Sequence, residues 1–315
     1  MAEMANVKEK LGAFKTQMME YFVGKESVAE NVLICLLAGG HVLLEDVPGV
    51  GKTTLARTLA KSMECDFGRI QFTPDTLPGD VIGTTVYRPN TGEFLYREGA
   101  VMHQIVLADE INRTSPKTQS SLLEAMAEGQ VTVDGKAYSL PEPFMVIATQ
   151  NPVEFLGTYP LPEAQMDRFM MRLSLGYPES AEELRLARNF LEGKTVAEIQ
   201  GVCTAEEVLA WKKEVEKVRL SDGLIKYVQE MVGLTRTEKS FVLGASPRAM
   251  LALIRASQAK AFLSWRDYVK PDDVKAVAIN VLHHRLSLTP EAKIRKEDVD
   301  RLLKELILKT KVPME

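Results

Sequence analysis

The sequence predicts an α/β domain, with a parallel sheet and flanking helices, followed by an all-α domain. Short apolar runs of strand length alternate with helical patterns up to about residue 178, and this alternation is typical of a parallel sheet covered on both faces. Beyond Tyr177-Pro178 one helical pattern follows another. At roughly 150 residues per domain, the 315 residues allow two domains with sizeable cores. We therefore expect the first domain at residues 1–178 and the second at residues 179–315.

The first domain opens with an amphipathic helix. Five apolar residues lie three or four positions apart and so share one helix face: Val7, Leu11, Phe14, Met18 and Tyr21. Continuous apolar runs then predict three buried strands, at residues 41–44, 105–108 and 144–148. Helical patterns lie between them, at residues 52–62 and 117–128.

The second domain is predicted to consist of helices whose apolar residues recur at helical spacing. Its five segments are residues 205–218, 222–235, 247–262, 271–286 and 296–308. Pro247 and Pro271 begin two of these segments, where the first turn of a helix tolerates proline.

Charge balance and cysteine placement argue against several classes of protein. The 39 Lys and Arg against 43 Asp and Glu give a formal net charge of −4, which disfavours a protein that coats nucleic acid or anionic lipid. The three cysteines lack the C-x-x-C spacing of a zinc or redox site and are expected to be buried thiols in a reducing compartment. The longest apolar run, residues 32–44, is too short to span a bilayer, and the first residues lack the features of a secretory signal. We expect a cytoplasmic protein with no membrane insertion.

A glycine-containing loop joins the first predicted strand to the helix at residues 52–62. Backbone N–H groups of such a loop and of the helix N-terminus converge on phosphate oxygens. Lys52 is expected to reach the β- and γ-phosphates, and Thr53 to place its hydroxyl on Mg²⁺. Asp46 replaces the first glycine of the usual G-x-x-x-x-G-K-[ST] pattern, but Asp tolerates left-handed backbone geometry better than most residues. The candidate phosphate-binding residues are Pro48, Gly49, Val50, Gly51, Lys52, Thr53 and Thr54.

Two carboxylates end the second predicted strand. Asp109 is expected to hold Mg²⁺, usually through water, and Glu110 to orient and deprotonate the water that attacks the γ-phosphate. An apolar strand followed by Asp-Glu is common by itself, so the interpretation depends on its pairing with the phosphate loop. The third strand leads to Asn151, which can contact the same water, although its spacing alone favours a turn residue before Pro152.

These stretches, in this order and followed by a helical domain, resemble the AAA+ ATPases and more narrowly the MoxR family. The likeness runs from about residue 23 to residue 273. The most specific stretches are residues 44–49, 109–117, 123–126, 162–169 and 244–249. The resemblance implies a P-loop NTPase core followed by a helical lid domain, with ATP and Mg²⁺ as cofactors. Family members often carry Asp or Gly at the position of Asp46.

The resemblance also implies roles for individual residues. Asn151 matches sensor 1, Arg168 matches the arginine finger that reaches the γ-phosphate of a neighbouring subunit, and Arg248 matches sensor 2 on the lid. By their sequence context alone, Arg168 could be a surface residue paired with Asp167, and Arg248 a surface residue near a helix cap. Val23 and Gly24 match the short motif that contacts adenine. Whether Arg113 faces a subunit interface stays open.

Two predicted hairpins complete the likeness, at residues 86–96 and 131–138. In related motors such hairpins project toward a central pore and touch the client, whereas here ordinary edge structure is the alternative. The resemblance implies a homo-oligomeric ring, a hexamer in our prediction, with protein clients and a partner that carries a von Willebrand factor A domain.

Three functions compete for this sequence. The first is an ATP-driven motor that remodels, matures or activates client proteins or their complexes. The second is an assembly scaffold that ATP gates, with incidental turnover; the full set of Glu110, Asn151 and Arg168 argues against it because a binding module does not need these residues. The third is a DNA-associated motor, which the net charge of −4 disfavours. A GTPase is less favoured still, because no Asn-Lys-x-Asp motif occurs.

Overall fold

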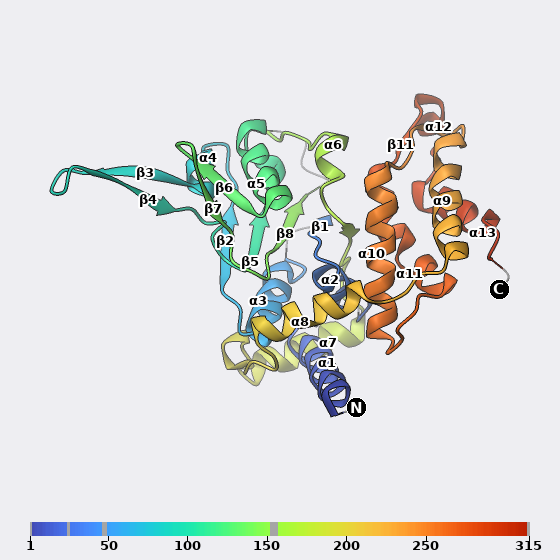
Figure 1. The fold of residues 1–315 in the computed structure, drawn as a ribbon, viewed down its shortest axis with the longest axis horizontal. Coiled ribbons are helices and arrows are strands. Elements are labelled where there is room, and N and C mark those ends of the chain that lie inside the picture. The colour runs from blue at the N-terminus through green and yellow to red at the C-terminus, as the bar shows by residue number, and fades with distance from the viewer. Residues whose placement is uncertain (1, 24–25, 46–48, 152–156, 314–315) are drawn as a thin grey trace. The chain divides into compact units, whose positions relative to one another are not determined.

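A computed structural model gives the fold and describes residues 2–23, 26–45, 49–151 and 157–313 (Figure 1). The chain divides into two compact units. The first comprises Met1–Glu30, His41–Leu161 and Leu173–Leu209, and the second comprises Asn31–Gly40, Pro162–Arg172 and Ala210–Glu315. The domain boundary at residue 178 stays a prediction.

A five-stranded sheet organises the first unit, in the strand order β2-β5-β8-β1-β9. The pairs β2/β5, β5/β8 and β1/β8 are parallel. Every residue of β5 is buried, as expected for a strand covered on both faces. The strands are β1 (Val42–Glu45), β2 (Phe67–Gln71), β5 (Ile105–Asp109), β8 (Met145–Gln150) and β9 (Met171–Leu173), which lies where the two units meet in the sequence. The sheet confirms the α/β fold class and the three predicted strands, and it adds β2 and β9.

Helices accompany this sheet at the three predicted places, together with others that were not predicted. Leu11, Phe14 and Met18 of the first helix are buried, which confirms its apolar face. The second predicted helix has the predicted bounds, and the third begins at Pro116 because Ser115 accepts a hydrogen bond from the Thr118 backbone N–H at 3.4 Å. The elements are α1 (Ala2–Tyr21), α2 (Glu26–Leu37), α3 (Lys52–Ser62), α4 (Pro78–Ile82), η1 (Ile111–Arg113), α5 (Pro116–Glu128), α7 (Ser180–Leu191), η2 (Val196–Glu198) and α8 (Ala205–Glu216), of which α2 and α8 continue into the second unit.

Two antiparallel hairpins leave the first unit where the sequence predicts them. One pairs β3 (Gly83–Arg88) with β4 (Glu93–Glu98), and the other pairs β6 (Gln130–Val133) with β7 (Lys136–Ser139). The second hairpin turns through Asp134 and Gly135, whose φ angles of 49° and 77° are those of a two-residue hairpin turn. Figure 1 shows the β3–β4 hairpin extending away from the sheet.

The second unit is mainly helical, as predicted. Small and β-branched side chains such as Ala256, Val277 and Ala278 are buried where α10 packs against α11. The segment predicted as a helix at residues 271–286 is helical to Leu282 and then continues as a 3₁₀ turn. The elements are α6 (Glu163–Met166), α9 (Asp222–Thr237), β10 (Phe241–Leu243), α10 (Pro247–Leu263), α11 (Pro271–Leu282), η3 (His283–Arg285), β11 (Ser287–Leu288), α12 (Pro290–Ile294) and α13 (Val299–Lys309).

In the described part of the chain, no helix is long and apolar enough to cross a membrane.

Candidate nucleotide site

The phosphate loop leads from β1 into the first turn of α3. Gly49 and Gly51 have φ angles of 86° and 90°, a left-handed conformation that favours glycine. Gly51 is the residue before the helix, and its carbonyl accepts the first helical hydrogen bond from Leu55 N–H at 2.9 Å. The first backbone N–H groups of a helix lack intrahelical acceptors, so this turn is suited to a phosphate. Lys52, Thr53 and Thr54 form that turn, Val50 is buried beside it, and Pro48 and Asp46 lie outside the described residues.

Three candidate side chains follow the ends of neighbouring strands. Asp109 is the last residue of β5, Glu110 follows it, and Asn151 follows β8. Because β5, β8 and β1 are adjacent and parallel, their carboxyl ends lie at one edge of the sheet, the edge where ligands bind in open α/β folds. The structure thus brings these side chains and the phosphate loop to the same edge. Their individual roles stay predictions.

The Asp109 carboxylate is engaged on both oxygens. Its Oδ2 accepts a hydrogen bond from Arg69 Nε at 2.8 Å, and the Arg69 Nη2 lies at the same distance. Its Oδ1 accepts from the Thr149 hydroxyl at 3.2 Å. Arg69 comes from β2 and Thr149 from β8, the two strands that flank β5, so the sheet itself holds this carboxylate in place.

Glu110 adopts a left-handed backbone conformation, with φ 58° and ψ 48°. For a residue other than glycine this geometry is strained and is commonest at functional sites. The Thr149 hydroxyl accepts a hydrogen bond from the Glu110 N–H at 2.9 Å and so helps to hold the turn. The Glu110 Oε2 accepts from Gln71 Nε2 at 2.9 Å and pairs with Arg113 Nε at 3.2 Å. In a regular strand, successive side chains point to opposite faces, and the left-handed turn at Glu110 breaks that alternation just after Asp109.

The segment after β5 is fixed by a buried amide of α5. Gln119 Nε2 lies within 2.9–3.3 Å of the backbone carbonyls of Ile111, Thr114 and Tyr159. Asn112 Nδ2 lies 3.5 Å from the Asn151 carbonyl, which joins this segment to the end of β8. Asn151 is itself buried. These contacts hold the segment that directly follows Glu110.

The two candidate arginines belong to the second unit. Arg168 is half-buried just after α6, and Arg248 is exposed in the first turn of α10. Asp167 accepts hydrogen bonds from Ser246 Oγ at 2.9 Å and from Arg285 Nε at 2.6 Å, so the residue before Arg168 is tied to the cap of the helix that carries Arg248. Val23, the candidate adenine contact, is buried in the first unit, and Gly24 lies outside the described residues.

Comparisons with known proteins agree with this geometry. Residues 41–171 match the family described as "ATPase family associated with various cellular activities (AAA)", and residues 233–306 match an AAA lid domain. The chain is 50% identical to the protein YeaC of Bacillus subtilis over all of its own length and 98% of that protein. It is 42% identical to Chaperone MoxR1 of Mycobacterium tuberculosis over 88% of this chain and 75% of that protein, and 32% identical to Protein MoxR of Paracoccus denitrificans over 87% and 88%.

The chain belongs to the MoxR family of AAA+ ATPases. Its fold agrees with that assignment: a crystal structure of a protein from Cytophaga hutchinsonii, described as a candidate ATPase, superposes with a TM-score of 0.92 at 41% identity, over 99% of this chain and 98% of that one. This MoxR-family protein binds ATP and is an ATPase.

The site of this MoxR-family protein suits Mg²⁺ by the chemistry of its donors. Mg²⁺ prefers oxygen ligands, keeps several waters and is usually held by one or two protein groups plus substrate phosphates. The Thr53 hydroxyl and the Asp109 carboxylate are such donors. Among the described residues, no three His, Cys, Asp or Glu side chains gather as a metal cage, so a metal here would depend on phosphate oxygens and water. A metal at Asp109 would also have to compete with Arg69.

Sequence reasoning missed the residues that hold the two carboxylates. Arg69 and Gln71 stand two positions apart on β2 and therefore face the same side of the sheet. That period of two was the available signal, but residues 67–71 contain few apolar residues and no strand was predicted there. Thr149 and Gln119 gave no signal, because their partners are distant in sequence.

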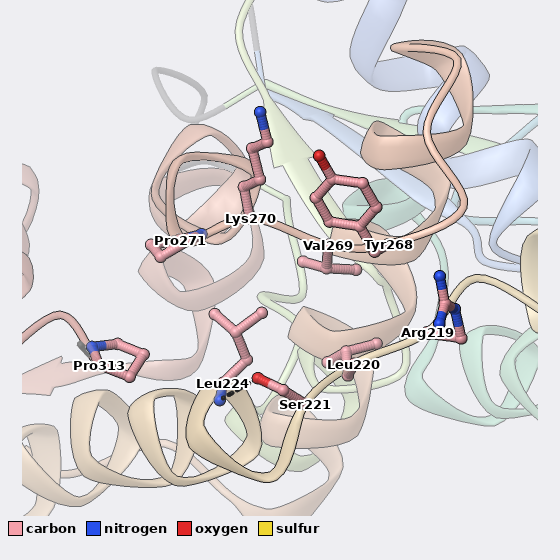
Figure 2. Close-up of a pocket in the computed structure, with 9 residues that line it drawn as sticks. All are labelled: Arg219, Leu220, Ser221, Leu224, Tyr268, Val269, Lys270, Pro271 and Pro313. Atoms are coloured by element: carbon pink, nitrogen blue, oxygen red, sulfur yellow. Dashed lines mark hydrogen bonds between the residues drawn. The ribbon is translucent and has the colours of Figure 1, made fainter. Parts of the chain in front are cut away.

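Two hollows in the MoxR-family chain lie apart from these residues. One, of about 570 Å³, is in the second unit, where side chains from the segments before α9 and α11 face each other with Pro313 nearby (Figure 2). The other, of about 600 Å³, lies in the first unit at the C-terminal end of α3 and includes Cys65. All three cysteines are free thiols; Cys35 and Cys203 are buried as predicted, whereas Cys65 is half-buried. Burial raises the pKa of Cys65 to about 12 and that of Cys203 to about 12, so both stay protonated near neutral pH.

Proposed function

We propose that this protein is a Mg²⁺-dependent ATP-driven motor that remodels, matures or activates client proteins or their complexes. The observation that carries the proposal is the pair Asp109 and Glu110 at the end of β5, with Glu110 turned and held by Thr149 and Gln71. A module that only binds nucleotide has no need for a second carboxylate stored in a strained left-handed turn. The name of the relative Chaperone MoxR1 supports a role on other proteins.

In this proposal each residue has one task in hydrolysis. Lys52 neutralises the β- and γ-phosphates, and Thr53 and Asp109 hold Mg²⁺, which supplies charge stabilisation when bound. Glu110 accepts a proton from the water whose oxygen attacks the γ-phosphorus, while the bond to ADP breaks. Asn151 orients that water. For this step Glu110 has to exchange its contact with Gln71 or Arg113 for one with water.

The proposal also includes an assembly. Arg168 would enter the site of a neighbouring subunit in a hexameric ring and neutralise charge as the phosphoryl group transfers, while Arg248 would report the nucleotide state to the lid. The ring would act in the cytoplasm with a partner that carries a von Willebrand factor A domain. Support for assembly comes from the AAA family itself, whose members are generally oligomeric.

The projecting hairpin is the proposed client contact. Tyr87 and Phe94 form a ring pair with centroids 5.2 Å apart, and they are 51% and 69% exposed. Exposed aromatic pairs are common in binding surfaces because they bury large area at low entropic cost. Tyr96 stacks on Tyr138 at 3.9 Å, so the β3–β4 hairpin is joined to the β6–β7 hairpin.

The decisive variant is Glu110→Gln. The amide keeps the size of the side chain but cannot accept a proton, so we expect ATP affinity within about threefold of the wild type and turnover lower by roughly 100-fold or more. Equilibrium binding of a fluorescent ATP analogue measures the affinity, and steady-state ATPase rates measure the turnover. The control is Glu128→Gln, an exposed glutamate at the end of α5, which should leave both unchanged. Unchanged turnover in Glu110→Gln would show that the base is misassigned.

A second measurement separates the motor from the ATP-gated scaffold. Proteins that co-purify with Glu110→Gln in ATP are added to the wild type, and the ATPase rate is followed. A motor is expected to turn over faster with its client. A rate that no captured protein changes would favour the scaffold.

A further inference from the structure

Arg285 carries a buried charge in the second unit. It ends the 3₁₀ turn η3, and its side chain is only 2% exposed. Burial lowers the pKa of this guanidinium from its ordinary value, and the hydrogen bond that it donates to Asp167 opposes that shift. A buried charge is tolerated only where its hydrogen-bonding groups are satisfied.

All N–H groups of this guanidinium find acceptors. Its Nε donates to Asp167 Oδ1 at 2.6 Å, one Nη donates to the carbonyls of Met170 at 3.1 Å and of Val281, and the other donates to the carbonyls of Asp167 at 3.2 Å and Phe169 at 2.7 Å. Three of these carbonyls and the carboxylate belong to residues 167–170. Arg285 therefore fixes the backbone on both sides of Arg168.

Asp167 connects this segment to the N-terminal cap of α10. Its second oxygen, Oδ2, accepts a hydrogen bond from Ser246 Oγ at 2.9 Å, and the same Ser246 oxygen accepts from Ala249 N–H at 3.1 Å as the cap of the helix. Arg248 lies between these two residues in the first turn. The charge of Arg248 makes a small contribution to the lowered pKa of Arg285.

We propose that Arg285, Asp167 and Ser246 form a relay of positioning residues that holds Arg168 and Arg248 as one body. The inference rests on the proposed function, in which Arg168 acts on the γ-phosphate of a neighbouring subunit and Arg248 reports the nucleotide state to the lid. The relay residues do not touch nucleotide in this scheme. When Arg248 follows the nucleotide state of one subunit, the relay moves Arg168, and the neighbouring site gains or loses its arginine.

The test compares two serines that cap helices of the same unit. Ser246→Ala removes the cap of α10 and the link to Asp167, whereas Ser221→Ala removes only the cap of α9, where Ser221 Oγ accepts from Leu224 N–H at 3.3 Å (Figure 2). The two lost caps should lower the melting temperature by similar amounts. Displacing catalytic groups by about 1 Å can cost 100-fold in rate, so we expect kcat of Ser246→Ala to fall by roughly 10-fold or more relative to Ser221→Ala. The KM for ATP should change by less than about threefold, since the phosphate loop is untouched.

A second pair of variants tests the relay without removing a helix cap. Asp167→Asn breaks the relay, and Asp273→Asn breaks another partly buried arginine pair of the unit, in which Arg266 lies 2.6 Å and 2.5 Å from the two Asp273 oxygens. At equal loss of melting temperature, a larger loss of kcat in Asp167→Asn supports the relay. Equal kcat losses within both pairs would overturn it.

Arg168→Ala, measured alongside, separates this inference from the proposed function. If Arg168→Ala keeps wild-type turnover, the proposed role of Arg168 fails, and the relay fails with it. If Arg168→Ala loses turnover while Ser246→Ala matches Ser221→Ala, the relay alone is wrong.

Discussion

Arg69 forms an ion pair with Asp109, the carboxylate that is proposed to bind Mg²⁺. Its guanidinium lies 2.8 Å from Asp109 Oδ2, and a cation in this position competes with a metal ion for the same oxygen. Removing it has two opposed consequences, easier access for the metal and an Asp109 charge that is less well compensated when no metal is bound.

Arg69→Met should therefore lower the Mg²⁺ concentration that gives half-maximal ATPase rate by roughly three- to tenfold, an effect of about 1 kcal/mol at this partly buried pair. The melting temperature without nucleotide should fall, and added Mg²⁺ should restore more of it than in the wild type. Arg57→Met, an exposed arginine of the same unit, is the control for the loss of one positive charge. An unchanged Mg²⁺ dependence in Arg69→Met would mean that Asp109 does not hold the metal.

His284 gives the second unit a pH-dependent stability. Burial lowers its pKa well below 6.5, with smaller contributions from Arg285, Arg172 and His283, while its bond to the Phe169 carbonyl at 3.0 Å acts the other way. The folded state therefore keeps His284 neutral where the unfolded chain binds a proton. Stability from this residue is complete above about pH 6.5 and is lost as the pH falls, by about 1.4 kcal/mol per pH unit.

Urea unfolding of wild type and His284→Gln at pH 7.0, 6.0 and 5.0 measures the contribution of His284 to the free energy of unfolding. The glutamine amide can still donate toward Phe169 but does not titrate in this range. The difference in unfolding free energy between the two proteins should shrink as the pH falls. Parallel pH curves would show that the pKa of His284 is the same in the folded and the unfolded protein.

At the scale of secondary structure, strongly periodic segments were predictable. The helix at residues 52–62 has the predicted bounds, because an apolar face and a left-handed Gly51 define it locally. The strand β2 was missed, because Arg69 and Gln71 interrupt its apolar pattern in order to reach Asp109 and Glu110. The helix α7 was missed as well: none of its residues is buried, although Leu184 and Leu191 lie on one face.

The candidate site likewise has residues that the sequence predicts and contacts that it does not predict. Residues that a loop or strand end places, such as Lys52 and Asp109, follow from local pattern. The contacts that hold them come from neighbouring strands at sequence separations near 40, as for Arg69 with Asp109 and Thr149 with Glu110, and no spacing rule reveals such partners. The left-handed conformation of Glu110 is of this second kind, since the surrounding structure maintains it.

The β3–β4 hairpin carries a prediction of its own. Tyr87→Ser with Phe94→Ser removes the exposed ring pair, and because these rings are largely in solvent the loss should cost the fold little. When this double variant is combined with Glu110→Gln, the amount of client protein captured per hexamer in the presence of ATP should fall several-fold. The affinity for ATP should stay the same. Val242→Ser, which is also 69% exposed but lies on β10, is the control. If the hairpin variant and the Val242→Ser control capture equal amounts of client protein, the hairpin does not contact the client.

At the scale of the whole molecule, function is proposed to need more than one chain. The net charge of −4 hides a few cationic residues that are proposed to converge on a single polyanion, ATP. Lys52 belongs to the first unit, and Arg168 to the second, and the proposal assigns them to sites of adjacent subunits. Each subunit would then supply the loop of one site and the arginine of the next.

Mixing two inactive variants tests this claim most directly. Lys52→Ala should not hydrolyse ATP but keeps Arg168, and Arg168→Ala keeps the loop but should lose roughly 1,000-fold in rate at its neighbour's site. In randomly mixed rings at equal ratio, about a quarter of interfaces join the two intact halves, so the mixture should recover roughly a quarter of the wild-type rate per subunit. A mixture no more active than its components, with mixed rings confirmed by native mass spectrometry, would contradict a site that is completed across the subunit interface.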